Sequence, residues 1–162
     1  MRLARVLWST LSISLAFAAL SLAALAQETS PEEPATAEGS RRLVAVVHTR
    51  DDRGRVFCAI WRGREGYPTQ RVHAVGQAMD RTIVRHRGVC VFDDVTPGEY
   101  ALAAFHDENA NNDLDRNIFG IPSEGTGASN DAHNMFGPPG YDDARFQYPD
   151  VQLHRIAVHI HY

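Results

Sequence analysis

The stretch RRLVAVVHTRDDRGRVFCAIW, residues 41–61, carries the strongest fold signal in the chain. Residues 41–48 and 55–61 are short runs rich in valine, isoleucine and aromatic side chains, which favour β-strands. Both runs place apolar side chains on both strand faces, as is typical of strands covered on two sides. The turn residues 51–54 (DDRG) separate the runs, so the pattern predicts a β-hairpin.

Further strand signals follow at short spacing. Residues 99–105 have the cleanest alternation of the chain, and residues 156–162 alternate at its end. Residues 63–80 carry apolar side chains at spacings of three and four, which predicts a short helix there. Many Gly and Pro turns separate the strands. The pattern predicts an all-β fold, an antiparallel β-sandwich.

Residues 1–26 have the three parts of a secretory signal peptide. Arg2 and Arg5 precede a long apolar stretch, which ends in Ala24-Leu25-Ala26. The alternative is a retained membrane anchor, because the apolar stretch is almost long enough to span a bilayer. The small residues before Gln27 favour cleavage. We therefore expect a periplasmic or secreted protein that has no membrane span after signal cleavage.

The remaining chain divides into a leader and a domain. Residues 27–40 are acidic, contain prolines and lack large apolar side chains, which predicts a disordered acidic leader. Residues 41–162 are expected to form a single β-sandwich domain. Cys58 and Cys90 both lie in strand-like runs, and an oxidising compartment predicts a disulfide between them. The alternative, a free catalytic thiol, lacks a local partner motif.

Charge and composition exclude several kinds of function. The 162-residue chain has a formal net charge of −4 at pH 7, and its arginines are spread along the sequence. Nucleic-acid binding requires clustered cations, so we expect no nucleic-acid partner. The chain contains no lysine, which excludes lysine Schiff-base chemistry and a phosphate-loop lysine.

Residues 105–151 are rich in Asn, Asp, Gly and Pro and show no strand or helix pattern. Such a segment predicts one long ordered polar loop. It begins with HDENANNDLDRN, residues 106–117, in which side chains with oxygen ligands recur at every second position. These are Asp107, Asn109, Asn111, Asp113 and Asp115.

This spacing matches positions 1, 3, 5, 7 and 9 of an EF-hand-type calcium loop. Asn112 stands where such loops have glycine, and Ile118 stands where they have a bidentate glutamate. A Ca²⁺ cofactor would therefore need another carboxylate, for which Glu124, Asp142 and Asp143 are candidates. The alternative is an ion-free loop, in which Asp and Asn side chains bond nearby backbone amides.

Histidines provide the other candidate sites. His106 ends a strand-like run beside Asp107 and Glu108, where it could act as a general base. The alternative is a buried histidine that bonds the loop backbone. His159 and His161 share a strand face and could chelate zinc, although an exposed strand edge has the same pattern.

Three aromatic residues of the loop, Phe119, Phe136 and Tyr141, have two interpretations. They could form a platform for a sugar or peptide. We favour the other interpretation, in which they form a small core that pins the loop to the sandwich, because so polar a loop needs apolar anchors.

Several motifs resemble the secreted family known as domain of unknown function 2141, over about residues 42–162. They lie at residues 97–101, 106–109, 111–117, 119–122, 124–125, 129–130, 136–139 and 143–146. The chain departs from the family pattern at Asn112, where glycine is usual, and at Ala128, where an aromatic residue is expected. The resemblance implies a transthyretin-like or immunoglobulin-like β-sandwich outside the cytoplasm, and it implies no activity.

Together, these observations favour a non-enzymatic binding or accessory module of the cell envelope. Its partner would be an envelope protein or a glycan. The chain contains no Gly-x-Ser-x-Gly motif for nucleophilic catalysis. The alternative function is a hydrolase that uses His106 and the loop carboxylates.

Overall fold

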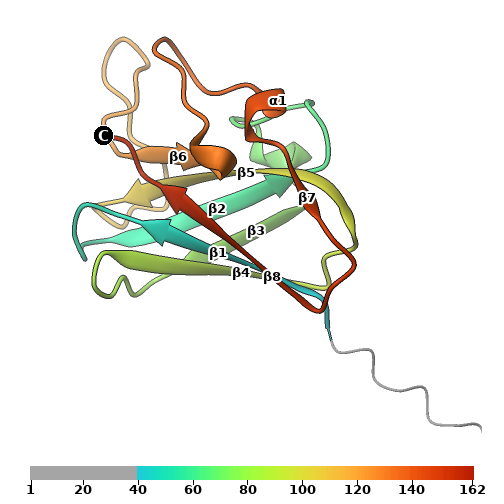
Figure 1. Cartoon of the computed structure of the whole chain (residues 1–162). Helices are drawn as coiled ribbons and strands as arrows, with labels where there is room; N and C mark the ends of the chain where they lie inside the picture. Colours follow the sequence, from blue (N-terminus) through green and yellow to red (C-terminus); the bar gives the residue numbers. More distant parts are fainter. Residues whose placement is uncertain (1–39) are drawn as a thin grey trace, which may run out of the picture. The chain divides into compact units, whose positions relative to one another are not determined.

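The computed structural model describes residues 40–162, in which eight strands form two β-sheets that pack face to face (Figure 1). This confirms the predicted all-β sandwich. The expected signal peptide and nearly all of the acidic leader lie outside the described residues. No helix within residues 40–162 is long and apolar enough to cross a membrane.

The smaller sheet has three strands in the order β4 (Arg87–Asp93), β1 (Arg42–His48) and β8 (Leu153–His159). β1 pairs with β4 in the antiparallel sense and with β8 in the parallel sense. The first and last strands of the described chain therefore lie side by side.

The larger sheet contains the remaining strands. Its order is β3 (Gly76–Asp80), β2 (Arg55–Trp61), β5 (Gly98–Asp107) and β6 (Thr126–Ala128), and β7 (Phe146–Tyr148) also pairs with β5. All pairs in this sheet are antiparallel. The helical segments are short: η1 (Arg71–His73), η2 (Ser129–Asp131) and α1 (Tyr141–Ala144).

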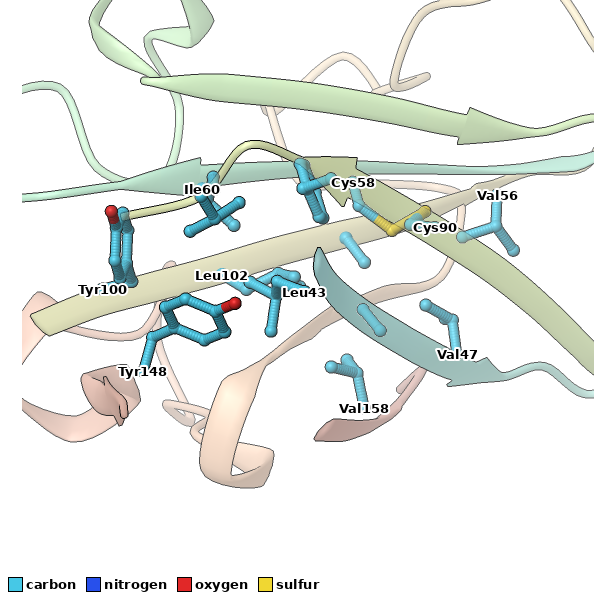
Figure 2. Close-up of a cluster of buried hydrophobic side chains, with 14 of the residues drawn as sticks. Leu43, Val47, Val56, Cys58, Ile60, Cys90, Tyr100, Leu102, Tyr148 and Val158 are labelled. Atoms are coloured by element: carbon cyan, nitrogen blue, oxygen red, sulfur yellow. A yellow bond between two sulfur atoms is a disulfide. The ribbon is translucent and has the colours of Figure 1, made fainter. Parts of the chain in front are cut away.

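The main core fills the space between the two sheets (Figure 2). Leu43 and Val47 of β1 face it from one side, and Val56 and Ile60 of β2 face it from the other. Burying side chains of this size stabilises the fold by about 1.5–3 kcal/mol each.

The disulfide Cys58–Cys90 crosses this core and confirms the predicted pairing. Cys58 belongs to β2 and Cys90 to β4, so the bond joins the two sheets covalently.

A second, smaller core covers the outer face of the larger sheet. Ala59 and Trp61 of β2 pack there against Tyr141 and Ala144 of α1. The presence of apolar residues on both faces of β2 thus has a direct cause, because each face has its own apolar cover.

The hairpin predicted for residues 41–61 is wrong, because β1 and β2 lie in different sheets. The turn between them carries the chain from one sheet to the other instead of folding it back. Gly54 in this turn has a φ of +65° and packs so closely on the backbone of Asp107 that a Cβ atom would collide with it.

The short helix predicted within residues 63–80 is also wrong, apart from the single turn η1. Residues 76–80 form β3, which gives hydrogen-bond partners to one edge of β2. The backbone groups along that edge of β2 need hydrogen-bond partners, which favours a strand. Gly76 also disfavours a helix, because glycine is destabilising inside one.

Two further boundaries differ from the prediction. Residues 105–151 contain β6, η2, α1 and β7, each of only three or four residues, which is too short to show a periodic pattern. The last strand covers residues 153–159 instead of 156–162.

Replacing both Cys58 and Cys90 by alanine should lower the free energy of unfolding by about 3–4 kcal/mol, the value expected from loop-closure entropy. Urea denaturation of the double variant and of the oxidised protein measures this difference. Adding dithiothreitol to the original protein should give a similar loss, whereas the variant should not respond. Equal stabilities with and without reductant would show that the inter-sheet bond contributes nothing.

Candidate functional site

His106 lies near the end of β5 on the inner face of the larger sheet and is fully buried. Its Nε2 lies 2.6 Å from the carbonyl oxygen of Arg53, and its Nδ1 lies 2.7 Å from the hydroxyl of Tyr162. Because a carbonyl only accepts, Nε2 donates to Arg53, and Nδ1 shares the second hydrogen bond with the Tyr162 hydroxyl. Both ring nitrogens therefore have partners within the fold.

Tyr162 closes this histidine off from solvent. Its hydroxyl accepts a hydrogen bond from the backbone N–H of Arg50, and the Arg50 guanidinium lies 4.3 Å from the Tyr162 ring centre. Burial raises the pKa of the Tyr162 hydroxyl, so this group stays protonated beside His106. This arrangement is that of a structural histidine.

Asp107, the next residue, begins the polar loop and is also buried. One carboxylate oxygen accepts the backbone N–H of Asn111 and the other accepts that of Asn112, at 3.0 and 2.8 Å. Arg55 lies 3.8 Å away and balances the charge. Asn112 has a φ of +70°, which asparagine adopts more readily than most residues.

Glu124 fastens the two ends of the loop together. Its buried carboxylate accepts the backbone N–H of Glu108 at 2.9 Å and that of Asp115 at 3.1 Å. Glu124 therefore does reach the Asp107–Asp115 segment, as a hydrogen-bond acceptor for its backbone.

The other candidate calcium ligands within residues 107–115 divide into two groups. Asn109 and Asn111 donate from their side-chain amides to the Asp115 carboxylate, at 2.6 and 3.0 Å. Asp113 instead points to solvent, 3.8 Å from the Arg71 guanidinium. Within residues 40–162, no three His, Cys, Asp or Glu side chains lie close enough together to hold a metal ion.

His159 and His161, the candidate zinc pair, have separate partners. His159 stacks on His48, with ring centres 4.7 Å apart, and its Nδ1 lies 2.8 Å from the Asp131 carboxylate. His161 lies beside His133, with ring centres 5.1 Å apart. Burial and the neighbouring His159 lower the pKa of His48.

The three loop aromatics do not form a common core. Tyr141 is buried in the second core, where its ring packs edge-on against Tyr67, as the anchor interpretation requires. In contrast, Phe119 is 79% exposed and Phe136 is 90% exposed, so the anchor interpretation is wrong for these two residues.

Phe119 lines a groove on the outer face of the larger sheet. The groove encloses about 660 Å³. Its floor comes from β2 and β5, with the side chains Phe57, Ala59, Trp61, Ala103 and Phe105. Three segments, 68–71, 113–122 and 132–139, wall it, and two of them rise together beside β6 (Figure 1).

Two polar groups of the groove were not identified from sequence. The guanidinium of Arg71 lies 4.8 Å from the Phe57 ring centre and covers one end of the floor. Trp61 lies at the other end of the floor segment of β2, and its indole N–H is buried without a partner among residues 40–162. The available signal was the outer face of residues 57–61, where alanine lies between two aromatic residues.

Replacing Glu124 by glutamine should lower the free energy of unfolding by about 1–3 kcal/mol, because the amide leaves one half-buried backbone N–H, that of Glu108 or of Asp115, without an acceptor. Thermal or urea unfolding measures the loss. Asp150→Asn, which changes an exposed carboxylate, is the matched control and should have little effect. Equal stabilities of the two variants would contradict the anchoring role of Glu124.

Comparison with known proteins assigns the chain to a family. A profile described as "uncharacterized protein conserved in bacteria (DUF2141)" matches residues 44–155, from β1 through the polar loop into β8. No curated protein and no solved structure matches the chain significantly. The chain therefore belongs to the DUF2141 family of bacterial proteins, as its loop motifs predicted.

Proposed function

We propose that this protein is a non-enzymatic binding module of the bacterial cell envelope, and that the groove is its ligand site. The observation that carries the proposal is a groove of about 660 Å³ with exposed apolar side chains at its rim. Ligand sites commonly have this size and a mostly apolar lining with a few polar groups. The partner classes that we consider are an envelope protein and a glycan.

The bonding of the candidate catalytic groups supports a binding function over hydrolysis. Both nitrogens of His106 have partners inside the fold, and the Glu124 carboxylate is occupied by backbone amides. Ser129 is buried, and its hydroxyl bonds the backbone of Leu102 and Ala144. None of these groups is free to attack or deprotonate a substrate in this arrangement.

Two features support a location outside the cytoplasm. Residues 1–26 have the composition of a cleavable signal peptide. The Cys58–Cys90 disulfide fits an oxidising compartment such as the periplasm, since cytosolic thiols are usually kept reduced.

Photo-crosslinking in living cells tests the groove as the ligand site. A p-benzoylphenylalanine replacing Phe119 should give a covalent adduct after irradiation, because this rim side chain is exposed beside the groove. The same group replacing Val84, which is 57% exposed and does not line the groove, is the control. Mass spectrometry detects the adduct. An absent adduct at position 119, or equal adducts at both positions, would contradict the proposal.

We also propose that Ca²⁺ stabilises the loop from Asp107 to Asp115. The side chains of Asp107, Asn109 and Asn111 accept backbone N–H bonds within the loop, as the first ligands of an EF-hand-type loop do. The positive φ of Asn112 supplies the turn that glycine usually makes. The amides of Asn109 and Asn111 would have to rotate so that their oxygens face the ion.

Added CaCl2 should raise the melting temperature, and EDTA should lower it. Calcium at 100 times its Kd stabilises by about 2.7 kcal/mol. Asp115→Asn, which removes one carboxylate that faces Asn109 and Asn111, should abolish the response, and Asp150→Asn should retain it. An unchanged melting temperature under all conditions would leave the loop as an ion-free, self-bonded unit.

A further inference from the structure

We propose that two apolar loop tips of this protein insert into the surface of a phospholipid bilayer. The first tip is residues 118–121 and the second is residues 135–136, at the ends of the two loops that rise together beside β6 (Figure 1). The inference goes beyond the proposed groove, because it concerns the outer ends of these loops. Ile118 and Phe136, which belong to the tips, do not line the groove.

Both tips consist of large apolar side chains that the rest of the described chain leaves uncovered. The exposed fraction runs from 59% for Ile121 to 94% for Ile118 in the first tip, and it is 89% for Met135 in the second. Side chains exposed to this degree project into the surrounding medium. Exposed apolar surface of this kind marks contact with a protein or with a membrane.

The first loop is held in one shape by its own hydrogen bonds. The backbone N–H of Ser123 donates to the carbonyl of Asp115, and that of Asn117 donates to the carbonyl of Ile121, both at 2.9 Å. Arg116 and Pro122 form an antiparallel β-bridge between these two bonds. The loop is therefore a short hairpin, and its backbone fixes the outward position of the apolar tip.

The first tip also supplies acceptors for its own backbone N–H groups. The side-chain oxygen of Asn117 accepts from Phe119 at 3.0 Å and from Ile121 at 3.1 Å. The Asn117 carbonyl accepts from Gly120 at 2.9 Å, and Pro122 has no N–H. A segment that enters hydrocarbon must bond its polar groups internally, whereas a protein partner can supply acceptors of its own. The bonding of this tip thus favours a bilayer over a protein.

The second tip meets this demand only in part. The Asn134 side-chain amide donates to the carbonyl of Pro138 at 3.0 Å, and Pro138 and Pro139 have no backbone N–H. The backbone N–H groups of residues 135–137 have no acceptor within residues 40–162. Because these groups need water, we place the second tip in the hydrated headgroup layer and the first tip deeper.

The charges of the first loop fit a layer of lipid phosphates. The exposed guanidinium of Arg116 donates to the carbonyl of Gly120 at 2.9 Å, so it lies at the tip. An arginine in this position pairs with phosphate oxygens of the headgroups. The carboxylates of Asp113 and Asp115 belong to the base of the loop, and Asp113 lies 3.8 Å from Arg71. The end that faces the bilayer is therefore apolar and cationic.

A dye attached to each tip tests insertion directly. An environment-sensitive nitrobenzoxadiazole group on Phe119→Cys should become brighter and shift to shorter wavelength when vesicles of phosphatidylethanolamine and phosphatidylglycerol are added. The same group on Phe136→Cys should respond less, because the second tip stays in the headgroup layer. Val84→Cys, at an exposed valine in the turn before β4, is the control and should not respond.

Flotation of the protein with the same vesicles measures the affinity. The whole chain has a net charge of −4, so attraction to anionic lipid does not hold it by itself, and the apolar tips must supply most of the binding. Phe119→Ser should weaken binding about tenfold, the contribution of one phenyl group removed from water. Phe119→Leu should retain most of the affinity, and Val84→Ser should retain all of it. Thermal unfolding of each variant verifies that the fold is intact.

The vesicle experiments contain no other protein, so they separate a bilayer from a protein partner. A dye at position 119 that does not respond to vesicles would overturn the inference, as would equal responses at positions 119 and 84. If photo-crosslinking at position 119 gives a protein adduct while vesicles give no response, the tips serve a protein contact. The insertion inference then fails, and the proposed binding function stands.

Discussion

The buried Glu124 carboxylate accepts hydrogen bonds from two backbone N–H groups, and these bonds hold the polar loop in place. These amides, of Glu108 and Asp115, lie at opposite ends of the first part of the loop. Both N–H groups are half-buried, so leaving either one unpaired would destabilise the fold, and this cost restricts the path of the loop. The segment that follows Asp115 forms one wall of the groove. The shape of the groove therefore depends on the hydrogen bonds of Glu124.

Local sequence patterns were sufficient for the class of fold. Alternating apolar residues in 41–48, 55–61 and 99–105 predicted the strands, and the position of Cys58 and Cys90 in such runs predicted the disulfide. These patterns could not predict which strands pair with each other. A strand with apolar residues on both faces is compatible with a hairpin partner or with a crossing to the other sheet, since only tertiary contacts distinguish them.

The candidate site likewise has one part that the sequence predicted and one part that it did not. Regular spacing identified the loop from Asp107 to Asp115. Side chains of this loop do form hydrogen bonds with one another and with the loop backbone. The groove brings together strands β2 and β5 and loop segments from distant parts of the chain, so no local motif marks it. The exposure of Phe119 and Phe136 was equally hidden, because an aromatic residue in a polar loop usually packs as an anchor.

The parallel pairing of β1 with β8 has a consequence for how the chain folds. β1 is the central strand of its sheet, and one of its two neighbours is the last strand. The ladder from Arg42–Leu153 to His48–His159 thus joins segments more than a hundred residues apart in sequence. Contacts of such separation raise the relative contact order and slow folding, because a long loop must close before the pairing stabilises it. Until that closure, β1 exposes an unpaired edge, and the nascent protein is open to misassociation in the compartment where it folds.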